Sequence, residues 1–321
     1  MSALEITTLI GCPLACTFCP QDALSRSYGT SSRMMSLDTF KKCIDKIPPH
    51  VRIDFSGMSE PFVNPNCIDF IKYASLKPNP IVLFTTLTGI TNKICDELLV
   101  LIKSKRFNHV IIHLPDDSNN MPGYRFNKNY LYAASKLIGL DTVKTMTMSK
   151  NAAIDEKLLS EIEKLPNYSS IKKFLPKAKF IGKNRAGILD KEKVDNELLL
   201  DEVNWGCGIV CKSTPFYDHN VLLPDGRVVL CCMDYGMKHV IGNLAEQEYY
   251  ELFESDEINK IKIANMSLDQ NLKKDVICTQ CDHVYCWNNE NGIWSEKETF
   301  LQKGIRKIKE KSNILLKKII K

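Results

Sequence analysis

Apolar, β-branched runs alternate with segments of helical periodicity through the first 182 residues of the chain. The runs expected to form strands cover residues 4–10, 51–55, 81–85, 110–114, 142–147 and, more weakly, 177–181. Helical spacing of apolar residues covers residues 37–46, 67–76, 92–104, 130–138 and 156–164. Strand–helix units repeated at this spacing predict an α/β fold with a parallel sheet and right-handed crossovers. Six units are too few for a closed eight-unit barrel, so we expect a partial, TIM-like (β/α)6 barrel.

The pattern changes after about residue 183, where cysteines, glycines and short strand signals become frequent. Residues 220–230 are typical of a hairpin, because Asp225-Gly226 supplies a tight turn between two apolar runs. Helical spacing of apolar residues returns in residues 300–321. We therefore expect a partial barrel over residues 1–190, a small cysteine-rich α+β domain over 191–290 and a basic C-terminal helix over 291–321.

Thirteen cysteines are unusual in a chain of 321 residues whose hydrophobic (44%) and charged (25%) fractions are ordinary for a globular protein. The first ten residues lack the basic start and long apolar stretch of a secretory signal. No stretch approaches the roughly 18 apolar residues that a membrane span needs. We therefore expect a cytoplasmic protein with reduced thiols, in which clustered cysteines indicate metal binding or catalysis rather than disulfides.

Three of the cysteines, Cys12, Cys16 and Cys19, lie within eight residues directly after the first expected strand. Functional residues of parallel α/β sheets gather at the carboxyl ends of the strands, so this loop is a candidate metal site. Tetrahedral zinc takes four protein ligands, and the sequence offers no fourth nearby. A cubane [4Fe–4S] cluster held by three thiolates leaves one iron open for a non-protein ligand. A structural zinc with a distant fourth ligand is the alternative.

The spacing Cys12-x3-Cys16-x2-Cys19, with Phe18 before the last cysteine, resembles the signature of radical SAM enzymes. In that family the open iron binds S-adenosylmethionine (SAM), and an electron from the cluster cleaves SAM to a 5′-deoxyadenosyl radical that abstracts a substrate hydrogen. The resemblance implies that the three cysteines bind a [4Fe–4S] cluster and that Phe18 contacts the cofactor. It also implies the six-unit partial barrel.

A second segment, Gly57-Met58-Ser59-Glu60 after the second expected strand, resembles the GGE-type segment with which the family binds the methionine amino group. Met58 replaces the second glycine of that pattern. The resemblance implies SAM contacts from Gly57, Met58, Ser59 and Glu60, from Thr86 after the third strand and from Arg185. The alternative for Arg185 is a surface charge. His113, after the fourth strand, is either a contact to SAM or a semi-buried histidine.

A second set of cysteines joins Cys211 and Cys231, in a C-x14-G-x4-C arrangement, to the C-x2-C pair Cys278 and Cys281. By spacing alone, these four thiolates are suited to zinc or to an iron–sulfur cluster. Behind a radical SAM motif, the pattern resembles the SPASM/Twitch extension, which binds auxiliary [4Fe–4S] clusters. The resemblance implies that Cys211, Cys231, Cys278 and Cys281 hold one auxiliary cluster.

The remaining cysteines leave some assignments open. Cys207, Cys232 and Cys286 are one too few for a second auxiliary cluster with four protein ligands. Either Cys207 or Cys211, and either Cys231 or Cys232, can supply a given ligand to the first. Three further cysteines fall on helical patterns and are expected to be small buried apolar residues: Cys43, Cys67 and Cys95.

The resemblance implies a radical SAM oxidoreductase. A substrate radical beside an auxiliary cluster either loses an electron to the cluster and a proton to a base, which is dehydrogenation, or takes a hydrogen from a thiol, which is epimerisation. A single auxiliary cluster and a barrel that starts near residue 4 favour dehydrogenation of a carbohydrate-like or aminocyclitol alcohol. The alternatives are peptide modification, as by a RiPP maturase, and epimerisation of a sugar or peptide.

Charge is concentrated at the C-terminus. The net charge is +5, from 43 basic and 38 acidic residues, but residues 302–321 hold eight Lys/Arg and one Glu, so the remainder sums to about −2. The body of the chain is no nucleic-acid clamp, and we expect no nucleic-acid partner. The expected partners are a small-molecule substrate and an external reductase or a flavodoxin- or ferredoxin-type electron donor. We expect the tail to pack its apolar stripe on the protein, with an anionic membrane surface as the alternative.

Overall fold

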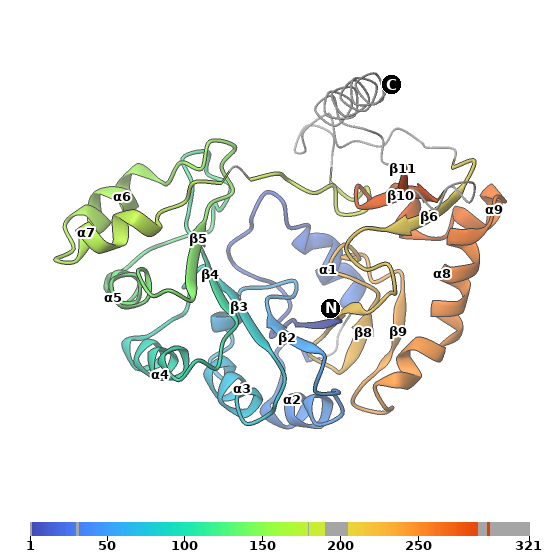
Figure 1. Cartoon of the computed structure of the whole chain (residues 1–321), viewed down its shortest axis with the longest axis horizontal. Coiled ribbons are helices and arrows are strands. Elements are labelled where there is room, and N and C mark those ends of the chain that lie inside the picture. The colour runs from blue at the N-terminus through green and yellow to red at the C-terminus, as the bar shows by residue number, and fades with distance from the viewer. Residues whose placement is uncertain (1, 30–31, 179, 190–204, 288–293, 296–321) are drawn as a thin grey trace, which may run out of the picture.

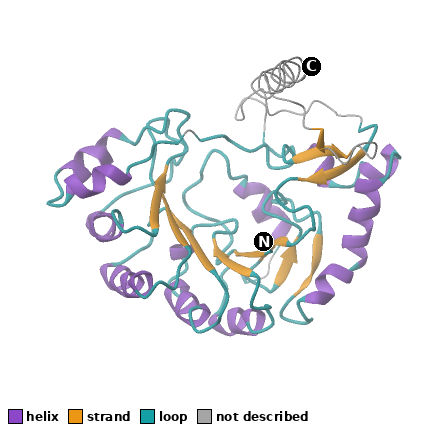
Figure 2. Ribbon diagram, in the orientation of Figure 1, coloured by secondary structure: helices purple, strands orange, loops and turns teal. Residues whose placement is uncertain are grey.

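The computed structural model describes residues 2–29, 32–178, 180–189, 205–287 and 294–295. Its centre is a curved sheet of eight strands in the order β5-β4-β3-β2-β1-β7-β8-β9 (Figures 1 and 2). A smaller sheet has the order β11-β10-β6. The strands are β1 (Ala3–Ile6), β2 (Arg52–Phe55), β3 (Ile81–Thr85), β4 (His109–His113), β5 (Val143–Met146), β6 (Gly208–Cys211), β7 (His219–Leu222), β8 (Arg227–Val229), β9 (Val240–Asn243), β10 (Val284–Trp287) and β11 (Trp294–Ser295).

Helices cover the outer side of the large sheet, where Figure 1 shows α2, α3, α4 and α5 along its convex face. The α-helices are α1 (Gln21–Tyr28), α2 (Leu37–Ile44), α3 (Cys67–Ala74), α4 (Asn92–Lys103), α5 (Lys128–Leu137), α6 (Glu156–Glu163), α7 (Tyr168–Ile171), α8 (Asp256–Met266) and α9 (Gln270–Lys273). Short 3-10 helices are η1 (Pro61–Val63), η2 (Lys172–Phe174), η5 (Tyr250–Glu254) and η6 (Ile277–Gln280).

Strands β1 to β5 are parallel neighbours in reverse chain order, as strand–helix repetition predicts. The hairpin expected over residues 220–230 also forms, as β7 and β8. Its first strand pairs in parallel with the free side of β1, in register from Ala3 opposite His219 to Ile6 opposite Leu222. The cysteine-rich half of the chain is therefore hydrogen-bonded into the same sheet as the barrel strands.

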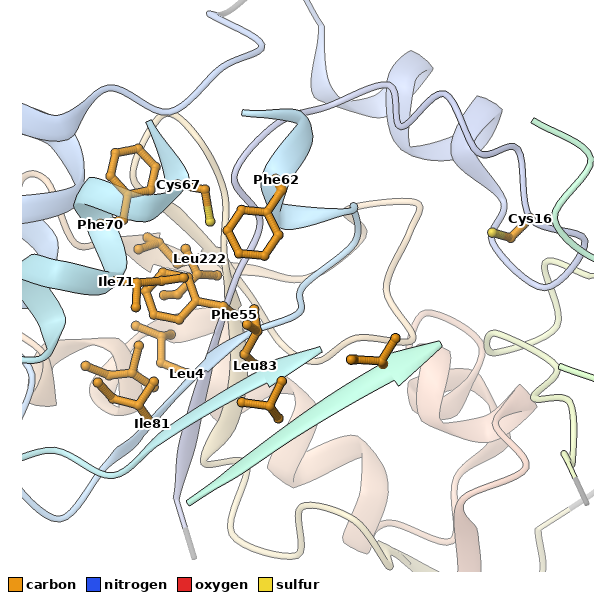
Figure 3. Close-up of a cluster of buried hydrophobic side chains, with 14 of the residues drawn as sticks. Leu4, Cys16, Phe55, Phe62, Cys67, Phe70, Ile71, Ile81, Leu83 and Leu222 are labelled. Carbon is orange, nitrogen blue, oxygen red and sulfur yellow. The ribbon is translucent and has the colours of Figure 1, made fainter. Parts of the chain in front are cut away.

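The main core lies between the parallel strands and the outer helices. Figure 3 shows Leu4, Phe55 and Leu83, from three adjacent strands, gathered near Phe70 and Ile71 of α3. Alternate strand residues face this layer because side chains along a strand point to opposite sides. Cys43, Cys67 and Cys95 are fully buried on α2, α3 and α4, which confirms their expected role as small core residues.

The strand expected over residues 177–181 is wrong for the residues described there, which form none. The segment is too polar for a buried strand, and its Phe180 turns inward, with its backbone N–H donating to the Ser149 carbonyl at 3.1 Å. Of the C-terminal helix expected over 291–321, Trp294–Ser295 form β11, and the rest lies outside the described residues. The expected domain boundary near residue 190 also falls there. No helix among the described residues is long and apolar enough to cross a bilayer.

Candidate functional site

The first three cysteines lie on the loop between β1 and α1, at the carboxyl end of the first strand. Cys16 is buried, and Cys12 and Cys19 are partly buried. A hydrogen bond with the Cys16 side chain, supported by the charge of Arg185, outweighs burial and lowers the pKa of Cys19 to about 6. Burial raises the pKa of Cys12 to about 11. The loop thus gathers three sulfur donors, one of which ionises readily.

Two neighbouring segments hold this loop. Gln21 accepts a hydrogen bond from the Cys12 backbone N–H at 3.2 Å and donates its own amide to the Met58 carbonyl at 2.7 Å. The loop after β4 approaches from the other side, where the Gly123 backbone N–H donates to the Leu14 carbonyl at 2.9 Å. A Cβ at Gly123 would lie 2.0 Å from the Pro13 carbonyl oxygen, so this approach requires glycine. Gln21 belongs to no motif, and the sequence analysis did not identify it.

The segment from Gly57 to Glu60 turns away from β2 beside the cysteine loop. Gly57 has φ +49°, and a Cβ there would lie 2.4 Å from Thr7 Oγ1. The next residue, Met58, donates its backbone N–H to the same Thr7 oxygen at 3.0 Å. The Ser59 hydroxyl is buried without a hydrogen-bond partner among the described residues. Because an unpaired buried hydroxyl costs free energy, a polar ligand group fits this position.

The Glu60 carboxylate is fully engaged within the protein. One oxygen accepts from the Thr85 hydroxyl at 2.7 Å and the Phe62 backbone N–H at 3.3 Å. The other accepts from the Thr86 backbone N–H at 2.6 Å and the Thr86 hydroxyl at 2.8 Å. Complete burial raises the pKa of Glu60 despite these donors. Glu60 therefore ties the Gly57–Glu60 segment to the end of β3, and Thr86 is part of that link.

These segments surround a cavity of about 310 Å³ at the carboxyl ends of the strands. Nine of the predicted site residues line it, namely Cys12, Cys16, Cys19, Gly57, Met58, Ser59, Glu60, Thr86 and Arg185. Phe18 does not: its ring packs on Phe180, with 5.0 Å between centroids, and its contact with a cofactor stays a prediction. His113 also lines the cavity, and burial lowers its pKa to about 4, so this imidazole is neutral near pH 7.

Arg185 lies between the cysteine loop and the second half of the chain. Its Nε donates to the Phe18 carbonyl at 3.0 Å and its Nη1 to the Cys232 carbonyl at 3.3 Å. The guanidinium carbon lies 5.3 Å from the centroid of the Tyr235 ring, within the range of a cation–π contact. The side chain therefore joins two loops, which is a different role from that of an isolated surface charge.

A charged network extends from the strands behind this cavity, and its Glu5 lines the cavity wall. Glu5 accepts a hydrogen bond from the Ser56 hydroxyl at 3.2 Å, and its other oxygen lies 3.0 Å from His219 Nε2. Behind them, Asp54 receives two hydrogen bonds of 2.6 Å from Arg52. Burial disfavours a charged His219, but the neighbouring Glu5 carboxylate outweighs it and raises the His219 pKa. The one sequence signal of this network is a glutamate inside the apolar first strand.

The four cysteines of the second set surround another cavity, of about 230 Å³, with mostly apolar walls. Cys211 ends β6, Cys231 follows β8, and Cys278 and Cys281 lie at η6, so three separate elements bring them together. Burial raises the pKa of each of the four. Thiols this buried are inert unless a metal replaces the proton.

Cys231 and Cys232 face different neighbours. The groups that act electrostatically on Cys231 include Cys278 and Cys281, whereas those acting on Cys232 are Glu5 and Arg185. Cys232 lines both cavities. The geometry therefore favours Cys231 as the member of the four-thiol set and leaves Cys232 in the wall between the two cavities.

His239 connects the elements that carry these cysteines. Its Nδ1 lies 2.5 Å from a Glu257 oxygen on α8, and its Nε2 accepts the backbone N–H of Ile277, next to Cys278, at 3.1 Å. Its backbone N–H donates to Asp234 at 2.8 Å, in the loop that follows Cys231. The ring is fully buried. Because Nε2 accepts a hydrogen bond, the ring proton is on Nδ1, and Nδ1 donates a hydrogen bond to the Glu257 carboxylate.

Cys207 and Cys286 form a disulfide between the start of β6 and β10. The expectation that clustered cysteines avoid disulfides is therefore wrong for this pair, because their two strands are adjacent in the small sheet and bring the thiols together. Pairing removes both from the pool of ligands and leaves Cys211 for the four-thiol set.

The donor sets fit clusters better than single ions. Among the described residues, no three His, Cys, Asp or Glu side chains are placed to share one metal ion. In a four-iron cluster each thiolate binds its own iron, so the sulfurs surround a space instead of meeting at a point. Two thiol-lined cavities, one with the three cysteines of the first loop and one with the four of the second set, match that requirement, and Cys232 lies in the wall of both.

Comparison with known proteins supports the same assignment. Residues 211–282 match the family model of SPASM, an iron–sulfur cluster-binding domain. Comparison with curated protein sequences finds no match. The crystal structure of BtrN in complex with AdoMet and 2-DOIA shares 17% identity at a TM-score of 0.55, over 92% of this chain and 98% of that one.

Structures of native anSMEcpe are similar too. The one with bound AdoMet shares 16% identity at a TM-score of 0.52, and the one with bound AdoMet and Kp18Cys peptide shares 15% at 0.53; both matches cover 97% of this chain and 99% of the other. The expected α/β fold class is confirmed. The likeness to these structures agrees with the expected overall fold, and the SPASM match agrees with the expected cysteine-rich iron–sulfur domain.

Proposed function

We propose that this chain is a radical SAM enzyme that oxidises a secondary alcohol of a small carbohydrate-like or aminocyclitol molecule to a ketone. The observation that carries the proposal is the adjacency of the two thiol-lined cavities, which share Cys232 as a wall. A molecule in the first cavity is then next to both cysteine sets. Such adjacency suits a reaction in which a hydrogen atom leaves on one side and an electron on the other.

In this proposal Cys12, Cys16 and Cys19 hold a [4Fe–4S] cluster that also binds SAM. A second, auxiliary [4Fe–4S] cluster is held by Cys211, Cys231, Cys278 and Cys281. When bound, these groups supply a hydrogen-abstracting 5′-deoxyadenosyl radical and a one-electron acceptor. With four thiolates, the auxiliary site keeps no corner open for substrate, which suits electron acceptance.

The polar groups beside the first cysteine loop would orient SAM. Ser59 offers a buried hydroxyl that no described residue engages, and the backbone from Gly57 to Ser59 follows the cavity wall. Arg185 and Thr86 line the same wall, although their side chains already bond to protein atoms. The Glu60 carboxylate has no acceptor position left, so we assign it to holding this segment in place.

Glu5 is the residue we propose to receive the hydroxyl proton of the substrate. Once a hydrogen atom has left the carbon, oxidation to the ketone is completed by loss of one electron and of that proton. Glu5 lines the cavity, and each of its oxygens has one neighbouring donor, so it retains acceptor capacity. His219, whose pKa is raised, lies behind Glu5 and can pass the proton on.

The test is anaerobic turnover of the reconstituted enzyme with SAM and dithionite in D₂O. Formation of 5′-deoxyadenosine tests the radical SAM assignment alone, because it needs no knowledge of the substrate. Candidate aminocyclitols, among them 2-DOIA, which the BtrN structure holds, then test the substrate class. A ketone product without deuterium on carbon supports dehydrogenation. A product of unchanged oxidation state with one carbon-bound deuterium excludes it.

Epimerisation is the second candidate, because Cys232 is a partly buried thiol in the wall of the first cavity. A thiol there can return a hydrogen atom to a substrate radical from the side opposite the cysteine loop. Replacing Cys232 with alanine distinguishes the two functions: dehydrogenation would continue, whereas epimerisation would stop. For peptide modification, the decisive observation is turnover of a peptide encoded beside the gene, as anSMEcpe structures hold peptides.

The reaction needs one electron for each SAM molecule that is cleaved and not regenerated. We propose that a flavodoxin- or ferredoxin-type protein or an external reductase supplies it. Replacing dithionite with such a carrier and its reductase, and following 5′-deoxyadenosine, tests this partner directly.

A further inference from the structure

We propose that Tyr235, from the cysteine-rich half of the chain, is a positioning residue that sets the reduction potential of the cluster held by the first cysteine loop. The inference rests on the proposed function, because it assumes a [4Fe–4S] cluster at Cys12, Cys16 and Cys19. It assigns the hydroxyl of Tyr235 as a hydrogen-bond donor to the sulfur of Cys19.

The first step of the argument is the place of Tyr235. The residue follows the hairpin β7–β8 and lies 2% exposed, among the largest fully buried side chains of the protein. It lines the first cavity together with Cys19, not the cavity of the four-thiol set. Tyr235 is one of the groups that act on the Cys19 thiol, and Cys19 is one of those that act on the Tyr235 hydroxyl. A residue distant in sequence is thus a neighbour of Cys19 in the wall of the first cavity.

The second step is the contact that holds Tyr235 there. Arg185 lies against the Tyr235 ring at 5.3 Å and donates to the carbonyls of Phe18 and Cys232, at 3.0 and 3.3 Å. Phe18 immediately precedes Cys19, and Cys232 precedes Tyr235 by three residues. One guanidinium therefore fixes the cysteine loop and the Tyr235 loop relative to each other, and adds a positive charge beside the same sulfur.

The third step is electrostatic. Reduction adds one negative charge to an iron–sulfur cluster, and hydrogen bonds to its sulfurs stabilise the reduced state more than the oxidised one. Loss of the Tyr235 hydroxyl therefore makes the cluster harder to reduce. We expect the ratio of reduced to oxidised cluster, at a fixed potential, to fall about tenfold, which for one electron is a shift of about 59 mV to more negative potential.

The experiment compares Tyr235→Phe with Tyr217→Phe in the full-length reconstituted protein. Each change removes one phenolic hydroxyl, but Tyr217 lines the other cavity, where it accepts a hydrogen bond from Asn265 at 3.0 Å. The readout is an EPR-monitored redox titration of the signal that changes when SAM is added, since that signal belongs to the cluster with the open iron. A negative shift in Tyr235→Phe alone is the expected result.

Equal potentials in wild type and Tyr235→Phe, with full iron content in both, would overturn the inference. A second variant, Arg185→Lys, keeps the charge but loses the two-carbonyl bridge, and we expect a smaller negative shift from it. Absence of any SAM-sensitive signal in the wild type would instead refute the proposed function. The two failures are therefore distinguishable.

Discussion

The two cysteine-lined cavities differ in what surrounds the sulfurs. The first has polar and charged side chains in its wall, namely Glu5, His113 and Arg185, together with the Ser59 hydroxyl, which has no hydrogen-bond partner among the described residues. The second is walled mainly by apolar side chains, such as Leu230, Ile277 and Val284, and holds the four cysteines of the second set in place of the three of the first loop. A polar, incompletely ligated site is built to receive a further molecule, whereas a dry and fully ligated site is built to hold a cluster and exchange electrons.

Removing either set of cysteines should have the largest effect, and it tests whether the two cavities have different roles. Wild-type protein reconstituted without oxygen should contain about eight irons per chain, four for each cluster. Replacing Cys12, Cys16 and Cys19 with alanine should leave about four irons and abolish 5′-deoxyadenosine formation.

The matched variant replaces Cys278 and Cys281. It should also hold about four irons but still cleave SAM, because the first cavity is intact. Equal loss of SAM cleavage in both variants would show that the two sites are not functionally separate. Iron and sulfide analysis together with chromatography of the nucleoside product provide the measurement.

An intermediate effect is expected from removing the side chain that organises each region. Glu60→Ala leaves buried donors of Thr85, Thr86 and Phe62 unpaired, which should lower the free energy of unfolding by about 3 kcal/mol or more. His239→Ala leaves the Ile277 N–H unpaired and should cost about 2 kcal/mol.

Urea denaturation measures the totals, and hydrogen exchange shows where the loss falls. Exchange should increase around β3 in Glu60→Ala and around η6 in His239→Ala. The exposed His50 provides the control, since His50→Ala should change neither quantity. Uniformly faster exchange in both variants would contradict the view of two locally organised sites.

The smallest effect expected is a pH dependence of the pair formed by Glu5, in the wall of the first cavity, and His219, in the wall of the second. The pKa of His219 is raised by Glu5 above its ordinary value of 6.5, so the pair stabilises the fold fully below that value and less as pH rises through the raised folded pKa. The stability difference between wild type and His219→Gln should therefore shrink, by about 1 kcal/mol, from pH 6 to pH 9. A difference that grows with pH would reverse the assigned sign.

The sequence predicted those parts of the sites that depend on local spacing. The loop with Cys12, Cys16 and Cys19 and the turn at Gly57 follow strands β1 and β2 as expected, and β7–β8 is the hairpin that Asp225-Gly226 predicts. These features need few residues close together in the chain, so their patterns are visible without knowledge of the fold.

Contacts between distant segments were not predictable in this way. Gln21, Glu5 and Tyr235 act through partners tens or hundreds of residues away, and no spacing rule connects them. The weak strand signal at 177–181 was misleading because the segment is too polar for a buried strand, and because pairing between strands is not encoded in either strand alone. Phe18 matched a motif, but tertiary packing turned its ring toward Phe180.

The parallel pairing of β7 with β1 has a consequence for the design of truncated fragments. A fragment that stops before β7 would expose a row of backbone N–H and C=O groups along β1, in the middle of what is now a continuous sheet. Such an uncovered strand recruits other chains, so the amino-terminal piece on its own should precipitate or oligomerise instead of behaving as a free-standing module. Excision experiments on this enzyme need a fragment that retains the hairpin.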